Sequence, residues 1–158
     1  MRVAILTISD SVSRGEREDR SGPALVERCR QLGWQVTSAL LTSDDQSSVR
    51  SQLRTICDSG HVDLLLTTGG TGLGPRDTTP EATLDVADRT IPGLAEEIRR
   101  KGGEKTPTAI LSRGVAAFRH KTIIINLPGS PKGAVESLDA IAPLLPHAIE
   151  VLHGAHHG

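Results

Sequence analysis

The sequence predicts a single α/β domain with three layers, α/β/α, around a mostly parallel central sheet. Short apolar runs rich in Val, Ile and Leu alternate along the chain with longer stretches whose apolar residues recur at helical spacing. Strands that are apolar at every position are typical of parallel sheets covered by helices on both faces. A length of 158 residues without internal repeats predicts one domain over residues 1–152, followed by a flexible tail over residues 153–158.

The first half of the chain alternates between strands and helices. The predicted elements are strands at residues 3–8, 35–41 and 62–68 and helices at residues 22–32 and 46–58. Gly33 stands where the end of a helix favours a left-handed residue. Val49, Leu53 and Ile56 recur at helical spacing and therefore define the buried face of the second helix.

Proline and hydroxyl residues mark the helices of the second half. The predicted elements are a helix that opens at residues 79–81, a helix at residues 94–100, a strand at residues 122–126 and a last helix at residues 134–151. Thr79 is the expected cap of the first of these helices, with Pro80 at its first helical position. Residues 92–93, Pro-Gly, are expected to break it. Ser130 and the proline after it repeat the cap-plus-proline signal before the last helix.

Composition excludes several classes of function. The 18 Lys and Arg residues nearly balance the 19 Asp and Glu residues, whereas binding nucleic acid by bulk electrostatics requires a basic excess. Trp34 and Phe118 are the only aromatic residues, too few for a platform on which bases stack. No apolar run approaches the roughly 18 residues of a membrane span, and no signal-peptide cleavage site follows the short N-terminal run. We therefore predict a cytoplasmic protein that binds neither nucleic acid nor membranes.

The cysteines and histidines are predicted to carry no chemistry. Cys29 and Cys57 lie far apart, match no metal-binding spacing and are too few for a disulfide framework. Buried, reduced thiols are the expectation for both. Three of the six histidines, at positions 153, 156 and 157, fall in the predicted tail, where they could bind metals only adventitiously.

Three polar loops follow predicted strands at the edge where open α/β sheets bind their ligands. They cover residues 9–11, 69–78 and 127–132. The middle loop opens with Gly69, Gly70, Thr71 and Gly72. Its closely spaced glycines let backbone amides approach an anion, and the threonine hydroxyls add donors. Because a proline-entered helix follows, phosphate binding is favoured over a merely flexible turn.

The glycine-rich loop matches neither of the two best-known phosphate-binding motifs. No Lys-Ser or Lys-Thr pair follows the glycines, so the loop is not a P-loop. Counting from Gly70, Pro75 occupies the third glycine position of G-x-G-x-x-G. These absences exclude a P-loop NTPase and an ordinary dinucleotide-dependent dehydrogenase. Ser130 also lacks the G-x-S-x-G surroundings of a nucleophile elbow.

Acidic residues follow two of the predicted strands. Asp77 lies in the glycine-rich loop, and the pair Asp44 and Asp45 follows the second strand. Both positions belong to the same edge of the sheet, where two carboxylates and substrate phosphates could share a Mg²⁺ ion. Aspartates in such places also serve as turn residues and helix caps. The spacing alone leaves the metal site and the structural role as open alternatives.

Four ordered segments resemble the molybdopterin adenylyltransferase family, which includes Mog- and MoaB-like proteins and the G-domain of gephyrin. They are Ile-Ser-Asp at residues 8–10, Thr-Thr-Gly-Gly-Thr-Gly at 67–72 with Pro-Arg-Asp-Thr-Thr-Pro-Glu-Ala-Thr at 75–83, Ala-Ile-Leu-Ser-Arg at 109–113, and Asn-Leu-Pro-Gly-Ser-Pro-Lys at 126–132. The resemblance runs from about residue 3 to residue 147. It implies the molybdopterin-binding fold, Mg²⁺- and ATP-dependent adenylylation of molybdopterin with release of pyrophosphate, and a homotrimer. The second domain of gephyrin-like proteins has no counterpart, so molybdenum insertion would need a separate protein.

The resemblance also implies roles for individual residues. Asp77 and Asp44 correspond to the family's catalytic aspartates and would hold Mg²⁺. Ser43 stands where the family usually has proline, which leaves Asp45 open as the second acid. The nucleotide would contact Asp10 and the loop of residues 69–72. The expected molybdopterin ligands are Ser112, Arg113, Pro128, Gly129, Ser130 and Lys132.

Two further interpretations stay open at this point. Arg14, Arg17 and Arg20 could close over a phosphate or pair in solvent with the acids at positions 16, 18 and 19. The domain could also be a molybdopterin carrier or sensor without turnover, or an enzyme acting on another nucleotide or pterin, as in the related domain of competence-damage-type proteins. The intact glycine loop and Asp77 favour the adenylyltransferase.

Overall fold

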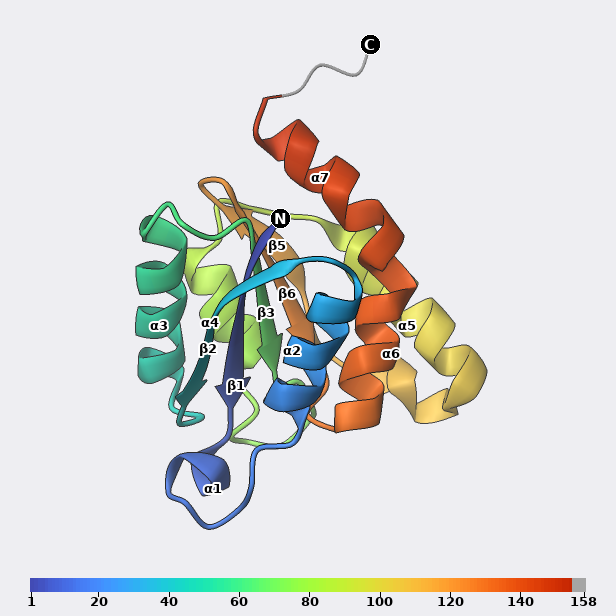
Figure 1. The fold of residues 1–158 in the computed structure, drawn as a ribbon. Helices are drawn as coiled ribbons and strands as arrows, with labels where there is room; N and C mark the ends of the chain where they lie inside the picture. The colour runs from blue at the N-terminus through green and yellow to red at the C-terminus, as the bar shows by residue number, and fades with distance from the viewer. Residues whose placement is uncertain (155–158) are drawn as a thin grey trace.

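A computed structural model describes residues 1–154, which form a mixed six-stranded sheet covered by helices on both faces (Figure 1). The strands are β1 (Arg2–Ile8), β2 (Gln35–Thr42), β3 (Leu64–Thr68), β4 (Arg89–Thr90), β5 (Ala116–Arg119) and β6 (Thr122–Leu127). Their order is β2-β1-β3-β6-β5-β4. The first four strands in this order, β2, β1, β3 and β6, are parallel to one another. Strand β5 is antiparallel to β6, and β4 is antiparallel to β5. The predicted three-layer fold with a mostly parallel sheet is confirmed.

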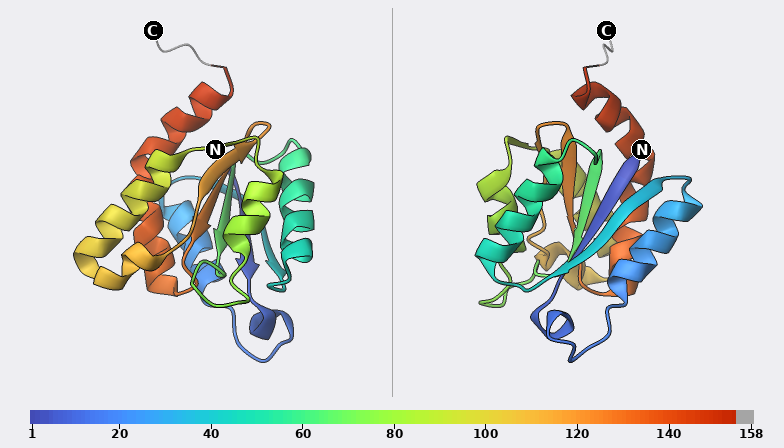
Figure 2. Two further views of the ribbon diagram at one scale, coloured as in Figure 1. Left: turned by 180° about the vertical axis from the view of Figure 1, so that it is seen from behind. Right: turned by 60° about the vertical axis from the view of Figure 1, so that its left-hand side comes forward.

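The helices divide between the two faces of the sheet. They are α1 (Asp10–Ser13), α2 (Ser21–Gln31), α3 (Gln46–Asp58), α4 (Thr79–Val86), α5 (Pro92–Lys105), α6 (Pro131–Ile141) and α7 (Leu145–Leu152), with 3₁₀ turns η1 (Pro107–Leu111) and η2 (Ala142–Leu144). Helices α3 and α4 cover one face, and α2, α5, α6 and α7 lie on the other (Figure 2). No helix within residues 1–154 is both long and apolar enough to cross a bilayer.

Successive residues of the central strands enter different layers of the core. On β1, Ile5 packs in the cluster that contains Leu138 of α6, and Leu6 packs in the cluster that contains Leu53 of α3. All four side chains are fully buried. Because side chains alternate between the two faces of a strand, covering both faces requires an apolar residue at every position. This requirement explains the unbroken apolar runs in the sequence.

The ends of two predicted helices differ from the prediction. Pro92 was expected to end a helix, but α4 already ends at Val86 and Pro92 begins α5. A proline lacks the N–H that the first turn of a helix leaves unpaired, so it is well tolerated there. Thr78, rather than Thr79, is the residue before α4, and the Thr79 hydroxyl donates instead to the Gly69 carbonyl oxygen at 2.9 Å.

The predicted last helix is interrupted, and His153 after it has a contact in the domain. Pro143 lies in the 3₁₀ turn that separates α6 from α7. At the end of α7, His153 Nε2 lies 2.9 Å from the Lys121 carbonyl oxygen, so this residue of the predicted tail contacts the body of the domain. His156 and His157 lie outside the described residues. Strand β5, which the sequence analysis missed, is short and joins β6 through His120 at a φ of 52°.

Cys29 and Cys57 are buried free thiols, as predicted. Burial raises the pKa of Cys29 to about 11 and that of Cys57 to about 12. We therefore expect a thiolate-specific disulfide reagent at pH 8 to label the native protein only as fast as the fold opens and exposes the thiols. The urea-unfolded protein should be labelled immediately. Immediate labelling of two thiols in the native protein would contradict this expectation.

The raised pKa values of the two thiols also make the stability of the fold depend on pH. Because both pKa values exceed the ordinary thiol value of 9.0, the free energy of unfolding should fall as the pH rises from about 9 towards 11 and 12.

Candidate functional site

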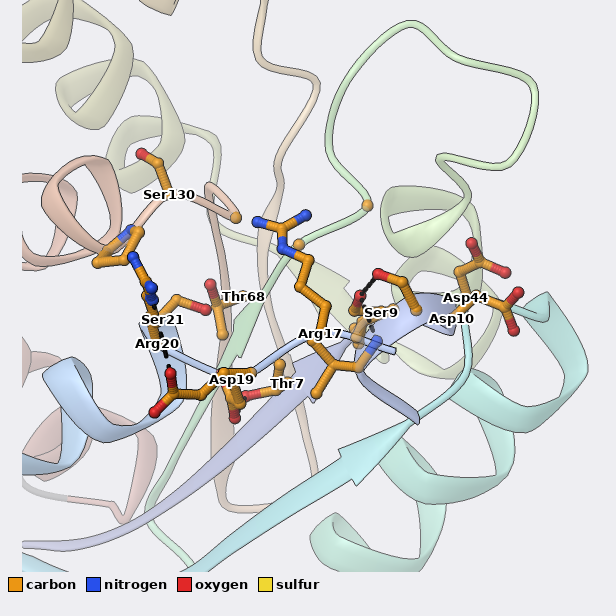
Figure 3. Close-up of a pocket in the computed structure, with 18 of the residues that line it drawn as sticks. Thr7, Ser9, Asp10, Arg17, Asp19, Arg20, Ser21, Asp44, Thr68 and Ser130 are labelled. Carbon is orange, nitrogen blue, oxygen red and sulfur yellow. Dashed lines mark hydrogen bonds and ion pairs between the residues drawn. The ribbon is translucent and has the colours of Figure 1, made fainter. Parts of the chain in front are cut away.

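A cavity of about 710 Å³ opens at the carboxyl ends of the parallel strands. Its walls come from the loops after β1, β2, β3 and β6 and from the segment that joins α1 to α2 (Figure 3). The prediction that the polar loops meet at one edge is therefore confirmed. Of the predicted site residues, the cavity is lined by Asp10, Asp44, Gly69, Gly70, Asp77, Gly129 and Ser130. We call it the nucleotide-side cavity after the ligand that the sequence resemblance predicts for several of these residues.

A second cavity, of about 530 Å³, lies beside the first between α5, η1 and α6. It is lined by four of the predicted molybdopterin ligands, namely Ser112, Pro128, Ser130 and Lys132. Lys101 and Lys105 of α5 add two further cations to its wall. Ser130 lines both cavities, so the two spaces adjoin at the N-terminus of α6. We call this second space the lysine-lined cavity.

Two glycines hold the ends of three strands close together. Gly69 has a φ of 105° and Gly70 a φ of 72°, values that residues with a side chain rarely adopt. The Gly69 amide donates to the Leu127 carbonyl oxygen at 3.1 Å, which ties the end of β3 to the end of β6. A Cβ atom at Gly69 would overlap the Ile8 carbonyl oxygen at the end of β1. Glycine is thus required here for close packing as well as for conformation.

Arg113 fastens the rest of the glycine-rich loop. Its backbone amide donates to Thr71 O at 2.9 Å, and its guanidinium donates to Gly72 O at 2.8 Å and to Asp77 O at 2.6 Å. The same guanidinium pairs with Glu81 at 2.7 Å, which lowers the pKa of that carboxyl group. Thr71, Gly72 and Arg113 line neither of the two cavities, and their predicted contacts with substrate stay predictions.

The structure separates the two adjacent aspartates that the sequence left as alternatives. Asp44 lines the nucleotide-side cavity, and its Oδ1 accepts a hydrogen bond from Arg76 at 2.7 Å. Asp45 caps α3, because its Oδ2 accepts from the Ser48 amide at 3.0 Å. One aspartate is therefore engaged in starting a helix, and the other faces the cavity.

Asp77 and Asp10 also face this cavity but have different partners. Asp77 Oδ2 accepts from the Gly74 amide at 3.0 Å, a bond that closes the loop on itself. Asp10 Oδ2 lies 2.5 Å from Arg14 and 3.5 Å from Arg76. The three acids thus come to one cavity from the loops after β1, β2 and β3.

The acids fit a divalent cation that arrives with a phosphate substrate better than a permanent metal. Within residues 1–154, no three His, Cys, Asp or Glu side chains are grouped closely enough to hold a metal ion. Mg²⁺ usually takes one or two carboxylates and completes its shell with water and substrate phosphate oxygens. Asp44 and Asp77 both line this cavity and are the candidate carboxylates for such a cation.

The arginines of the segment after α1 differ in their contacts. Arg14 pairs with acids at positions 10 and 16, and Arg20 lies 3.9 Å from Glu18. Arg17 forms no ion pair with any residue that the structure describes, and its guanidinium extends into the cavity (Figure 3). Asp19, which was expected to pair with these arginines, accepts instead from Thr7 Oγ1 at 2.8 Å and from the Gly22 amide at 3.0 Å.

Two arginines important to the site carried little signal in the sequence. Arg99 of α5 donates to the carbonyl oxygens of Ser112 and Gly114 at 3.3 and 2.9 Å, which holds the wall of the lysine-lined cavity. In the sequence it is one of several charged residues on an amphipathic helix. Arg76 immediately precedes Asp77 in one of the family-like segments, but its partners Asp10 and Asp44 lie on other loops.

Comparison with known proteins gives a consistent result. Residues 4–147 match the family described as "Probable molybdopterin binding domain". A molybdopterin adenylyltransferase of Helicobacter pylori (strain J99) is 38% identical over 159 residues, which cover 98% of this chain and 89% of that protein. The molybdopterin adenylyltransferase of Escherichia coli K12 is 41% identical over 150 residues, covering 89% and 73%. The crystal structure of the molybdopterin biosynthesis enzyme MoaB from Thermus thermophilus superposes with a TM-score of 0.91 at 51% identity, covering 98% and 97%.

Proposed function

The chain belongs to the family of molybdopterin-binding domains, and from this membership we propose that it is an enzyme of molybdenum cofactor biosynthesis that adenylylates molybdopterin. ATP would bind in the nucleotide-side cavity and molybdopterin in the lysine-lined cavity. The observation that carries this proposal is that the two cavities adjoin at Ser130. A reaction that joins two substrates requires neighbouring sites whose reacting ends meet.

The reaction follows from the chemistry of the two substrates. An oxygen of the terminal phosphate of molybdopterin forms a bond to the α-phosphorus of ATP, and the bond from that phosphorus to the bridging oxygen breaks, which releases pyrophosphate. A phosphate monoester has a second pKa of about 6, so the attacking oxygen is already ionised at neutral pH. No general base is required. The protein has to align two anions and to offset their repulsion.

Asp44 and Asp77 are the residues that would hold Mg²⁺ on the nucleotide. When bound, the cation supplies positive charge to the phosphate groups on which negative charge develops. The chain itself contributes the shape of the phosphate site through Gly69 and Gly70 and a guanidinium from Arg17. Arginine forms paired hydrogen bonds with phosphate oxygens, so Arg17 would hold the outer phosphates.

Ser130 is suited to the point where the substrates meet. Its Oγ accepts a hydrogen bond from the Gly133 amide at 3.1 Å, which caps α6. A hydroxyl group that already accepts can still donate its own proton, so Ser130 can donate to a phosphate oxygen. On the molybdopterin side, Lys105 and Lys132 lie 3.8 and 3.9 Å from Glu136, distances that leave both ammonium groups able to turn to an anion.

The decisive test is an adenylylation assay with purified protein, molybdopterin, ATP and Mg²⁺, followed by mass detection of adenylyl-molybdopterin. Product that depends on Mg²⁺ would support the proposal. Tight binding of molybdopterin without product would indicate the carrier or sensor instead. Neither binding nor product would mean that the ligand of this fold has changed in this chain.

Substitution of Asp44 and of Asp45 tests which of these adjacent aspartates is needed for turnover. Asp44→Asn is expected to lower turnover at least about tenfold, because a carboxylate on the nucleotide-side cavity is lost. Asp45→Asn should leave turnover within about twofold and cost at most a few tenths of a kcal/mol, because asparagine also caps helices well. Initial rates and thermal unfolding of the two variants provide the comparison. Loss of turnover in Asp45→Asn alone would reverse the assignment.

Some expectations depend on the family resemblance and stay predictions. They are the use of Mg²⁺, a cytoplasmic location, assembly as a homotrimer, and a separate protein that inserts molybdenum. Titration of activity with metal ions and measurement of the mass in solution would test the first and third of these.

A further inference from the structure

Arg76 connects two of the acids on the nucleotide-side cavity. Its Nη2 lies 2.7 Å from Asp44 Oδ1 and 3.5 Å from Asp10 Oδ2. We propose that Arg76 is a displaceable counter-ion, which occupies Asp44 until a divalent cation arrives with the nucleotide and then turns to the nucleotide's phosphates. The inference rests on the proposed function, in which Asp44 helps to hold the metal.

The solvent exposure of the three side chains indicates that Arg76, rather than Asp44 or Asp10, is the partner that can move. The Arg76 side chain is 65% exposed, whereas those of Asp44 and Asp10 are 20% and 21% exposed. The carboxylates are thus fixed in the cavity wall, and the guanidinium approaches them from solvent on the long glycine-rich loop. An exposed ion pair is weakly held, so little free energy opposes its exchange.

Charge explains why a cation is kept at this place before the metal binds. Asp44 and Asp10 lie within 4 Å of this guanidinium. Arg14 also pairs with Asp10, so Arg76 chiefly offsets the negative charge of Asp44. Hydrogen bonding and charge from Asp44, followed by the charge of Asp10, raise the pKa of Arg76, so the guanidinium leaves by movement and never by losing its proton. Arg76 therefore holds Asp44, the carboxylate of this pair to which the metal would later bind.

The same charge makes Arg76 a competitor of the metal. A guanidinium and a divalent cation on one carboxylate repel each other, so binding of the metal to Asp44 favours release of Arg76. The released side chain stays beside a cavity that would contain a triphosphate, for which arginine is a good ligand. Removing Arg76 should therefore have two opposite effects, with tighter binding of the free metal and weaker binding of the metal–nucleotide complex.

The test measures Mn²⁺ binding to the full chain by the electron paramagnetic resonance of free Mn²⁺, since carboxylate sites bind Mn²⁺ much as they bind Mg²⁺. Without nucleotide, Arg76→Gln is expected to bind Mn²⁺ about two- to fivefold more tightly than the wild type, as removal of an exposed ion-pair partner predicts. With Mn²⁺ saturating, the same variant should bind ATP more weakly. Arg76→Lys, which keeps the charge, should fall between wild type and Arg76→Gln in both measurements.

A matched control comes from Arg50, whose Nη1 lies 3.1 Å from Asp85 outside both cavities. Arg50→Gln makes the same change in net charge and should leave Mn²⁺ and ATP binding unchanged. If Arg50→Gln tightens Mn²⁺ binding as much as Arg76→Gln does, the effect is one of overall charge and the inference is wrong. Unchanged or weaker Mn²⁺ binding in Arg76→Gln would also overturn it.

Asp44→Asn separates this inference from the function on which it rests. If Asp44→Asn leaves Mn²⁺ binding unchanged, the proposed metal role of Asp44 fails and the inference fails with it. If Asp44→Asn weakens Mn²⁺ binding but Arg76→Gln does not strengthen it, only the inference on Arg76 fails. When both hold, the gain from Arg76→Gln should disappear in the Asp44→Asn background.

Discussion

Asp77→Asn is expected to lower the rate of adenylyl-molybdopterin formation at least about a hundredfold while the fold is retained. Asparagine has almost the same shape as aspartate, and its carbonyl oxygen can still accept the hydrogen bond from the Gly74 amide that closes the loop. What the variant loses is a negative charge on the nucleotide-side cavity. The rate is measured by mass detection of product under saturating ATP and Mg²⁺, and the fold by thermal unfolding.

Two comparisons make the result specific. Molybdopterin binding should persist in Asp77→Asn, because Asp77 does not line the lysine-lined cavity. Asp85→Asn serves as the control, since Asp85 pairs with Gln46 and Arg50 away from both cavities and should retain turnover. An Asp77→Asn protein that turns over within a few-fold of the wild type would remove Asp77 from the proposed machinery.

Gly69→Ala is expected to destabilise the domain by about 3–5 kcal/mol and to abolish nucleotide binding at temperatures where the protein still folds. The new methyl group would require a backbone φ of 105° and would overlap the carbonyl oxygen of Ile8. Ile8 ends β1, a central strand with neighbours on both sides, so it cannot move away cheaply. The thermal midpoint should fall by roughly 10 °C or more for a domain of this size.

Gly60→Ala isolates the conformational part of that cost. Gly60 has a φ of 75°, also in the left-handed region, but a Cβ atom there would meet no atom within 4 Å. This variant should lose only about 1 kcal/mol, or roughly 3 °C in thermal midpoint. Equal losses in the two variants would mean that close packing of the three strand ends contributes nothing.

Sequence patterns predicted the layered architecture and the sheet edge at which the polar loops meet, although they missed the short antiparallel strands β4 and β5. Apolar runs such as residues 122–126 predicted strands buried on both faces, and the Ser130-Pro131 pair predicted the start of α6 and its cap. These features depend on residues next to each other in the chain, so their physical causes are readable in the sequence. The loops that follow the strands could be placed together because parallel strands end at one edge of the sheet.

The tertiary structure alone decided what the side chains of those loops contact. Asp44 and Asp45 are adjacent in sequence, yet Asp44 accepts a hydrogen bond from Arg76 of another loop and Asp45 caps α3. Arg113 donates to Glu81 and to loop carbonyl oxygens that are all more than 30 residues away in the sequence. Such partners depend on how distant loops pack, and a side chain's local sequence does not specify which distant charge will reach it. The sequence therefore determined the fold, the family and the sheet edge at which the polar loops meet, and the three-dimensional packing determined which of their residues face the two cavities.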